Sequence, residues 1–313
     1  MDKFKFLNWS VVAFSLLMTT SLQAKTMNGF DLSGGLLPMD EIFQGGPPRD
    51  GIPAIDNPQF VTAAQMQELG ELEPSDLVLG VSVNGIHKAY PIRILNWHEI
   101  VNDNFAEQPV VITFCPLCGS GMAFEAQLDG IDLDFGVSGL LYNSDVLLFD
   151  RQTQSLWSQI EKQSVTGNYQ SRQLVDLAVQ NTTWQRWREQ YPDTQVLSFD
   201  TGYRRSYRRD PYAGYENSAN TFFPVKFRAM GLHPKEKVLG LEHQGLAKAW
   251  PLVELAKAKL PLLDNIGDMQ VMVHYDESSH TGHITDLQGQ LLPAVSLFWF
   301  AWAAFHDDTL LYR

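Results

Sequence analysis

The 313-residue chain is acidic, with 36 aspartates and glutamates against 23 lysines and arginines and a formal net charge of −13. This balance argues against nucleic acid or an anionic membrane surface as the main partner, because both attract positive charge. Since 44% of the residues are hydrophobic and only two are cysteines, the chain can bury a large core without relying on disulfide bonds.

The first 24 residues predict a secretory signal peptide. Lys3 and Lys5 precede an apolar run from Val11 to Met18, and small and polar residues follow up to Ala24. We therefore expect cleavage after Ala24 and a soluble, exported protein, which in a bacterium means the periplasm. The remaining sequence contains no stretch of roughly 20 apolar residues, so no membrane span is predicted.

Composition and an internal repeat divide the rest of the chain. Residues 25–60 are rich in glycine and proline and predict an extended N-terminal arm. We assign residues 61–313 to a single domain. Within it we expect copy one at about 73–165, a central segment at about 166–232 and copy two at about 233–313.

The repeat is seen directly in the sequence. "VLGVSVNGIHKAYPIRIL" from Val78 matches "VLGLEHQGLAKAWPLVEL" from Val238 without a gap, at a constant spacing of 160 residues. Each segment has a turn signal between two apolar runs and then a proline before a helical pattern. The strands "VVITF" from Val110 and "MQVMVHY" from Met269 follow. We predict a duplicated strand-strand-helix-strand unit, packed as one compact α+β body dominated by antiparallel sheet.

Two details of this alignment are specific expectations. The helix of copy one is predicted to run through "IRILNWHEIVND", with Ile100 and Val101 on its buried face. With a shift of one residue, the alignment places Cys115 of copy one opposite His274 of copy two.

The other elements are predicted from local patterns. The stretch "LDFGVSGLLYNSDVLLFDRQTQSLWSQI" has turn signals at Tyr142–Asp145 and Arg151–Gln154, which favour antiparallel hairpins. "TTWQRWREQY" predicts a helix capped by Thr182 or Thr183 and stopped by Pro192. "AVSLFWFAWAAF" is too short to span a membrane and predicts a buried strand or helix.

The segment "RRSYRRD" concentrates four arginines, Arg204, Arg205, Arg208 and Arg209, in an acidic chain. We expect these arginines to form internal ion pairs with the surplus carboxylates rather than an anion-binding patch.

Five motifs, in order along the chain, resemble the DUF3179 family of bacterial proteins. They are "NWHEIVND", "TFCPLCGSGMAFE", "FGVSGLLYNSDVLLFDRQTQSLWSQ", "RDPYAGY" and "FWFAWAAFHDDT". The resemblance covers nearly all of the chain after the signal peptide. It implies export and a single-family architecture, and it carries no established activity, so the chemistry rests on the residues themselves.

Both cysteines lie in "TFCPLCGSG", where Cys-Pro-x-Cys-Gly has the spacing of a metal-binding knuckle. Because there is one knuckle only, a four-thiolate site within one chain is excluded. We predict that Cys115 and Cys118 bind a metal together with His98, in the preceding helix, and His274 of copy two. Thiolate and imidazole ligands favour zinc or copper.

Two other interpretations of the cysteines stay open. In an oxidising compartment Cys115 and Cys118 can form a disulfide, either the active pair of a thiol–disulfide oxidoreductase or an inert link in a non-catalytic binding or interaction protein. The glycines after Cys118 argue against the oxidoreductase, because redox pairs of the thioredoxin type begin a helix.

A polar pocket is the last candidate site. Its expected residues, drawn from neighbouring turns, are Glu99, Asn143, Ser144, Asp145, Arg151 and Trp157. The sequence contains no phosphate-binding loop, dinucleotide fingerprint, Gly-x-Ser-x-Gly elbow or His-Glu-x-x-His motif, so no nucleotide cofactor is predicted. Whether the protein is an enzyme is left open by the sequence.

Overall fold

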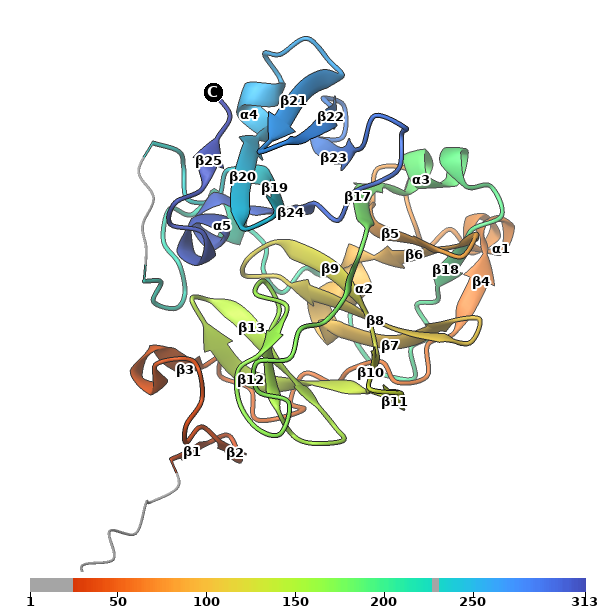
Figure 1. Ribbon diagram of the computed structural model, residues 1–313. Helices are drawn as coiled ribbons and strands as arrows, with labels where there is room; N and C mark the ends of the chain where they lie inside the picture. Colours follow the sequence, from red (N-terminus) through yellow and green to blue (C-terminus); the bar gives the residue numbers. More distant parts are fainter. Residues whose placement is uncertain (1–24, 227–230) are drawn as a thin grey trace, which may run out of the picture.

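Strands outnumber helices throughout residues 25–226 and 231–313, which are the parts of the chain described by the computed structural model (Figure 1). The helices are α1 (Ala63–Leu69), α2 (Ile92–His98), α3 (Trp184–Gln190), α4 (Leu252–Leu255) and α5 (Trp299–Phe305), with single 3-10 turns at Met39–Glu41 and Tyr215–Asn217. No helix in these ranges is long and apolar enough to cross a membrane. The signal-peptide prediction concerns residues 1–24, outside the described ranges.

The first structural unit consists of two sheets joined by α2. One sheet has the order β17-β5-β6-β18-β4 and the other β16-β9-β8-β7. Their strands are β4 (Phe60–Thr62), β5 (Leu77–Val83), β6 (Ile86–Pro91), β7 (Ile100–Phe105), β8 (Gln108–Cys115), β9 (Ser120–Glu125), β16 (Asp176–Leu177), β17 (Val179–Thr183) and β18 (Gln195–Leu197). We call this assembly unit one.

Unit two repeats the arrangement with sheets of the order β24-β19-β20-β25 and β21-β22-β23 around α4. Its strands are β19 (Lys237–His243), β20 (Leu246–Pro251), β21 (Leu262–Ile266), β22 (Met269–Asp276), β23 (Thr281–Thr285), β24 (Val295–Phe298) and β25 (Leu310–Leu311). In both units a strand pairs antiparallel with the first hairpin strand and another pairs parallel with the second. The predicted dominance of antiparallel sheet is therefore confirmed, and helices are few.

In both units a tryptophan ring packs against a glycine in the same way. An alanine Cβ at Gly80 would lie 2.2 Å from the ring of Trp187, and one at Gly240 would lie 2.3 Å from the ring of Trp302. Each indole N–H donates to a threonine hydroxyl at 2.8 Å. A glycine on the first strand thus lets a tryptophan from α3 or α5 lie directly against the backbone.

Because units one and two correspond element by element, their boundaries differ from those predicted for the two copies. We expected residues 166–232 to be a central segment between the copies. Instead, β17, α3 and β18 complete the first sheet of unit one, as β24, α5 and β25 complete that of unit two. The predicted helix cap at Thr183 is confirmed, because its hydroxyl accepts a hydrogen bond from the backbone of Arg186.

The helix of copy one ends earlier than its hydrophobic pattern indicates. Glu99 adopts a left-handed conformation, with φ of 58°, and its N–H closes the last turn of α2 by bonding to the carbonyl of Leu95. Ile100 and Val101 then belong to β7, where β-branched side chains fit well. Both are buried as expected, but in a strand rather than on a helix face.

The predicted pairing of Cys115 with His274 is wrong by two residues. Unit two has one more residue between Pro251 and Ile266 than unit one has between Pro91 and Phe105, so the hairpin registers align Thr113 with His274 and Cys115 with Asp276. Because both following turns contain four residues, Cys118 corresponds to Ser279.

A third sheet is formed mainly by strands inserted between β9 and β16 of unit one. Its order is β15-β14-β13-β12-β3, and its strands are β3 (Ile42–Gln44), β12 (Phe135–Tyr142), β13 (Asp145–Asp150), β14 (Leu156–Ser158) and β15 (Gln163–Ser164). Two small hairpins complete the set, β1 (Thr26–Met27) with β2 (Phe30–Asp31) and β10 (Gln127–Leu128) with β11 (Ile131–Asp132). The arm at residues 25–60 contributes β3 to the sheet edge, and its Ile55 bridges to Val101.

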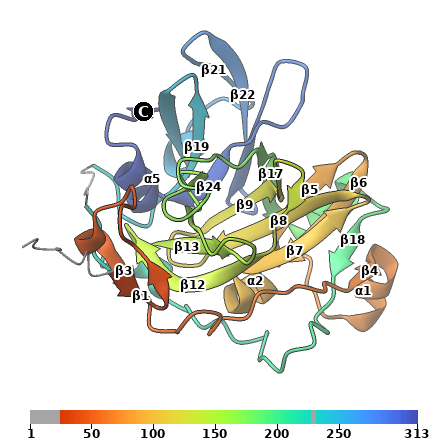
Figure 2. The same ribbon diagram turned by 60° about the horizontal axis from the view of Figure 1, so that its bottom comes forward.

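The inserted sheet lies beside β7, and β24 of unit two packs against β9 (Figures 1 and 2). α5 of unit two reaches the inserted sheet, where Asn143 Nδ2 donates to the carbonyl of Ala304 at 3.3 Å. One hydrophobic cluster joins the three parts, with Trp157 of the inserted sheet, Phe124 of unit one and Trp302 of unit two among its members. The expected burial of "FWFAWAAF" is confirmed, since Trp299 and Trp302 are 4% and 1% exposed. The cysteine hairpin is at this junction.

Candidate functional site

The two cysteines lie in the turn between β8 and β9. Cys115 is the last residue of β8 and pairs with Ser120, the first of β9, while Cys118 lies in the turn. Gly119 has a φ of 63°, a left-handed conformation that glycine adopts without strain. Both thiols are free and buried, at 1% and 0% exposure.

A second turn, between β12 and β13, closes over the thiols. Asn143 and Ser144 both have positive φ, as a tight two-residue hairpin turn requires. The carbonyl oxygen of Ser144 accepts hydrogen bonds from Cys118 Sγ at 3.4 Å and from Cys115 Sγ at 3.7 Å. This turn also places Asp145 next to the cysteines.

Cys115, Cys118 and Asp145 form a buried group whose potential ligand atoms all lie within 4.8 Å of one another. Asp145 Oδ2 accepts a hydrogen bond from the backbone N–H of Ile160 at 3.1 Å. Its buried Oδ1 has no hydrogen-bond partner of normal geometry among the described residues. Burial raises the pKa of Asp145 to about 7, against the opposing effect of the Ile160 N–H and the nearby thiols.

Glu99 adds a second buried carboxyl beside this group. Its left-handed backbone, which ends α2, directs the side chain toward the junction, where Tyr212 hydrogen-bonds to it. Burial, followed by the charge of Asp145, raises the pKa of Glu99 to about 8, although the bond from Tyr212 opposes the shift. Burial likewise raises the pKa of both thiols, and for Cys118 the neighbouring Cys115 raises it further.

A lysine and a tyrosine complete the surroundings. Lys235 is 5% exposed and lies near enough to Cys118 for the two charges to interact, with its Nζ 3.8 Å from the ring centre of Tyr215. The hydroxyl of Tyr215 is buried and has no partner among the described residues. Two orphaned polar atoms, on Asp145 and Tyr215, therefore lie close to the thiols. Buried polar atoms of this kind normally have a partner.

The cysteine hairpin is held firmly on its other side. Ser120 Oγ donates to Gln159 Oε1 at 2.7 Å, and Gln159 Nε2 donates to Thr113 Oγ1 at 2.8 Å, all three side chains being buried. From unit two, the N–H of Phe298 donates to the carbonyl of Cys118 at 2.8 Å. The thiols are thus positioned by the inserted sheet and by both units.

His98, the predicted third ligand, lies outside the cysteine group. Its Nδ1 is 2.8 Å from the carbonyl oxygen of Pro53 and its Nε2 is 2.7 Å from the hydroxyl of Tyr207, so both ring nitrogens are engaged. The early end of α2 explains the difference, because Glu99, rather than His98, points toward the cysteines.

His274, the predicted fourth ligand, is also elsewhere. It stacks on His283 with ring centres 4.5 Å apart, and its Nε2 is 3.2 Å from Thr285 Oγ1. Burial lowers the pKa of His274, and burial together with the charge of His274 lowers the pKa of His283 to about 4. The structure does not bring either predicted histidine to the thiols.

The expected polar pocket is divided between two places. Glu99, Ser144 and Asp145 surround the cysteines, and Asn143 supports the same turn through its side-chain bond to the backbone N–H of Lys226. By contrast, Arg151 pairs with Asp50 and Asp56 of the arm. The Trp157 indole donates to Asp150 at 2.9 Å. Arg151 and Trp157 are therefore structural.

Three residues around the thiols were not predicted from the sequence, namely Tyr212, Tyr215 and Lys235. The two tyrosines belong to "RDPYAGY", one of the five motifs, so a signal for them was present. Lys235 carries no sequence signal of its own, since only the fold brings it to Cys118.

Comparisons with known proteins extend this description at the level of family. Neither the curated proteins nor the solved structures provide a match to the chain. A family model described as "Protein of unknown function (DUF3179)" matches residues 49–288. This range includes the cysteine hairpin, the turn at Ser144 and the segment with Tyr212. The chain belongs to the DUF3179 family.

Proposed function

We propose that the protein binds a transition metal, most favourably zinc, through Cys115, Cys118 and Asp145. The observation that carries this proposal is the buried grouping of two thiols with a carboxyl whose Oδ1 lacks a partner. Two thiolates and one carboxylate leave a fourth position of a tetrahedral zinc site for Glu99, a water molecule or a substrate. A carboxylate ligand favours zinc over Cu(I), which prefers sulfur ligands.

Charge supports the same proposal. Cys115, Cys118, Asp145 and Glu99 are four acids buried together, and each has a raised pKa. Without a cation they must hold protons, because several buried negative charges repel one another. A divalent cation bound between them would replace these protons and stabilise the charged forms, which links metal binding to proton release.

The test is a metal determination on purified protein with matched variants. We expect about one zinc per chain in the wild type and its loss in Cys115→Ser and in Asp145→Asn. His274→Gln is the control, because His274 lies outside the group and should leave the metal content unchanged. Metal retained in Asp145→Asn but lost in His274→Gln would reject this ligand set and restore the one predicted from sequence.

Thiol–disulfide exchange is the second candidate, and Asp145 is the observation that favours it. A buried carboxyl with a pKa of about 7 beside two thiols can accept a proton from one of them at neutral pH. However, the cysteine turn leads into a strand instead of a helix, and burial raises both thiol pKa values. Metal-free protein whose thiols cycle reversibly with a glutathione buffer would favour this candidate.

We further infer that the two units arose by duplication and that the protein is exported. The first inference is supported by the common order and register of the units and by the tryptophan packed on each glycine. Asp276 and Ser279 occupy the positions of Cys115 and Cys118 in unit two, so the metal group would draw its two thiols from unit one and its carboxyl from the inserted sheet. Export rests on the sequence of residues 1–24, and N-terminal sequencing of the mature protein tests it, with cleavage expected after Ala24.

A further inference from the structure

The arginine segment does not form the ion pairs expected from the sequence. Arg204, Arg205, Arg208 and Arg209 are all exposed, and none of them makes a salt bridge with a carboxylate in the part of the chain that the structure describes. In a protein with a net charge of −13, four unpaired arginines in six residues create a local positive field. The expectation of internal ion pairs is wrong.

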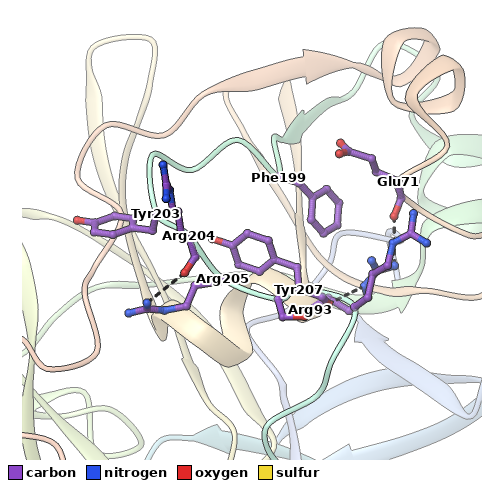
Figure 3. Close-up of a pocket in the computed structure, with 9 residues that line it drawn as sticks. Glu71, Arg93, Phe199, Tyr203, Arg204, Arg205 and Tyr207 are labelled. Carbon is purple, nitrogen blue, oxygen red and sulfur yellow. Dashed lines mark hydrogen bonds between the residues drawn. The ribbon is translucent and has the colours of Figure 1, made fainter.

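Three of these arginines line an open pocket of about 670 Å³, shown in Figure 3. In this view Arg204 and Arg205 lie on one side and Arg93 on the other, with the rings of Phe199 and Tyr207 between them. Arg208 also lines the pocket. The volume is in the range of small-molecule sites, roughly 300–1,000 Å³.

Hydrogen bonds fix the side of the pocket that lies opposite Arg204 and Arg205. Arg93 donates through Nη1 to Asp76 at 2.7 Å and to the carbonyl of Glu71 at 3.1 Å, and through Nε to the carbonyl of Tyr207 at 3.2 Å. Tyr207 is held in turn by His98 at 2.7 Å. Because Asp76 neutralises Arg93, the uncompensated charge of the pocket comes from the arginine segment.

We propose that this pocket binds a small organic anion, with its phosphate or carboxylate group on Arg204, Arg205 and Arg208 and its ring against Phe199 and Tyr207. Guanidinium groups present paired N–H donors that match both anions. The aromatic rings offer an apolar surface for the rest of the ligand. The acidic body of the protein disfavours a long polyanion, which would extend beyond the pocket. This site is separate from the cysteine group and does not depend on it.

Calorimetric titration of the purified protein with phenyl phosphate, benzoate, inorganic phosphate and phenol tests the proposal. We expect phenyl phosphate or benzoate to bind about tenfold more tightly than inorganic phosphate, owing to burial of the ring, and phenol to show no binding. The stronger of the two aromatic anions identifies the acidic group. Binding should weaken at high salt, because the arginines are exposed. Absence of binding by both aromatic anions, or equal binding of phenol, would overturn the proposal.

Matched variants locate the site. Arg205→Gln and Arg208→Gln should each weaken binding about tenfold, the effect of one lost charged hydrogen bond. Arg209→Gln is the control, because Arg209 does not line the pocket. Its backbone carbonyl accepts a hydrogen bond from the indole of Trp97, and the substitution leaves this carbonyl in place. Equal loss in Arg209→Gln, or far tighter binding of a single-stranded oligonucleotide than of phenyl phosphate, would contradict a small-anion pocket. Since all three side chains are exposed, the circular dichroism spectra should match the wild type.

Discussion

Glu99 and Asp145 are two buried carboxyls on different elements whose charges interact across the cysteine site. Glu99 ends α2 of unit one and Asp145 begins β13 of the inserted sheet. Burial raises the pKa of Asp145 to about 7, and burial with the charge of Asp145 raises that of Glu99 to about 8. The site therefore changes its protonation near neutral pH, and several measurable consequences depend on this.

The metal-free protein should lose stability as the pH rises from 5 to 8. In the unfolded chain these carboxyls titrate near 4.5 and 3.8, so over this range the native state holds more protons than the unfolded state. The free energy of unfolding must then fall with pH, by at most about 1.4 kcal/mol per pH unit for each proton. Urea denaturation in the presence of a chelator at pH 5, 6, 7 and 8 measures this slope.

Glu99→Gln should reduce the slope between pH 5 and 8, most completely between pH 7 and 8, where Asp145 has largely lost its proton. Glu107→Gln removes an exposed glutamate and serves as the control. An unchanged slope in Glu99→Gln would show that Glu99 is not the group responsible.

Zinc affinity should show the opposite dependence and increase from pH 6 to pH 8. The thiols and Asp145 must release protons before they can bind the metal, and burial raises the pKa of all three. Competition with a chromophoric chelator at each pH gives the affinity. Asp145→Asn should bind zinc more weakly at every pH, and a pH-independent affinity in the wild type would contradict thiolate ligands.

Trp187→Ala and Trp302→Ala should destabilise the protein to a similar extent, about 3–5 kcal/mol each. Each ring is buried and packs against a glycine of the first hairpin strand of its unit. Each indole N–H donates a hydrogen bond to a threonine hydroxyl. Urea denaturation measures the two losses. If Trp302→Ala were neutral, α5 could not be packed as the structure places it, and unit two would not repeat the packing of unit one.

The ion pair Lys88–Asp103 should contribute more than its counterpart Lys248–Asp264. Each lysine Nζ is within 2.9 Å of its partner carboxylate, but the side chains are 7% and 6% exposed in unit one against 13% and 16% in unit two. Lys88→Met leaves a buried aspartate with the hydroxyl of Tyr90 but without its cationic partner, which costs about 3–5 kcal/mol. Lys248→Met should cost less, because water reaches its aspartate. Equal losses in the two variants would indicate that burial does not set the difference.

The local parts of this structure could be predicted from the sequence because they depend on neighbouring residues. The Asn84-Gly85 turn, the cap at Thr183 and the hairpin turn before Asp145 are fixed by backbone preferences, and the repeat at Val78 and Val238 is visible without any coordinates. The cysteine spacing likewise identified the centre of the candidate site.

The partners of the cysteines were decided by tertiary structure alone. Glu99 leaves the helical conformation and ends α2. As a result, His98 faces Tyr207, and the carboxyl of Glu99 lies on the side of the thiols. A periodic pattern cannot reveal such a break, since Ile100 and Val101 are buried in either a helix or a strand. Asp145 reaches Cys115 because an inserted sheet packs on unit one, a contact between residues distant in sequence that depends on the packing of the whole core.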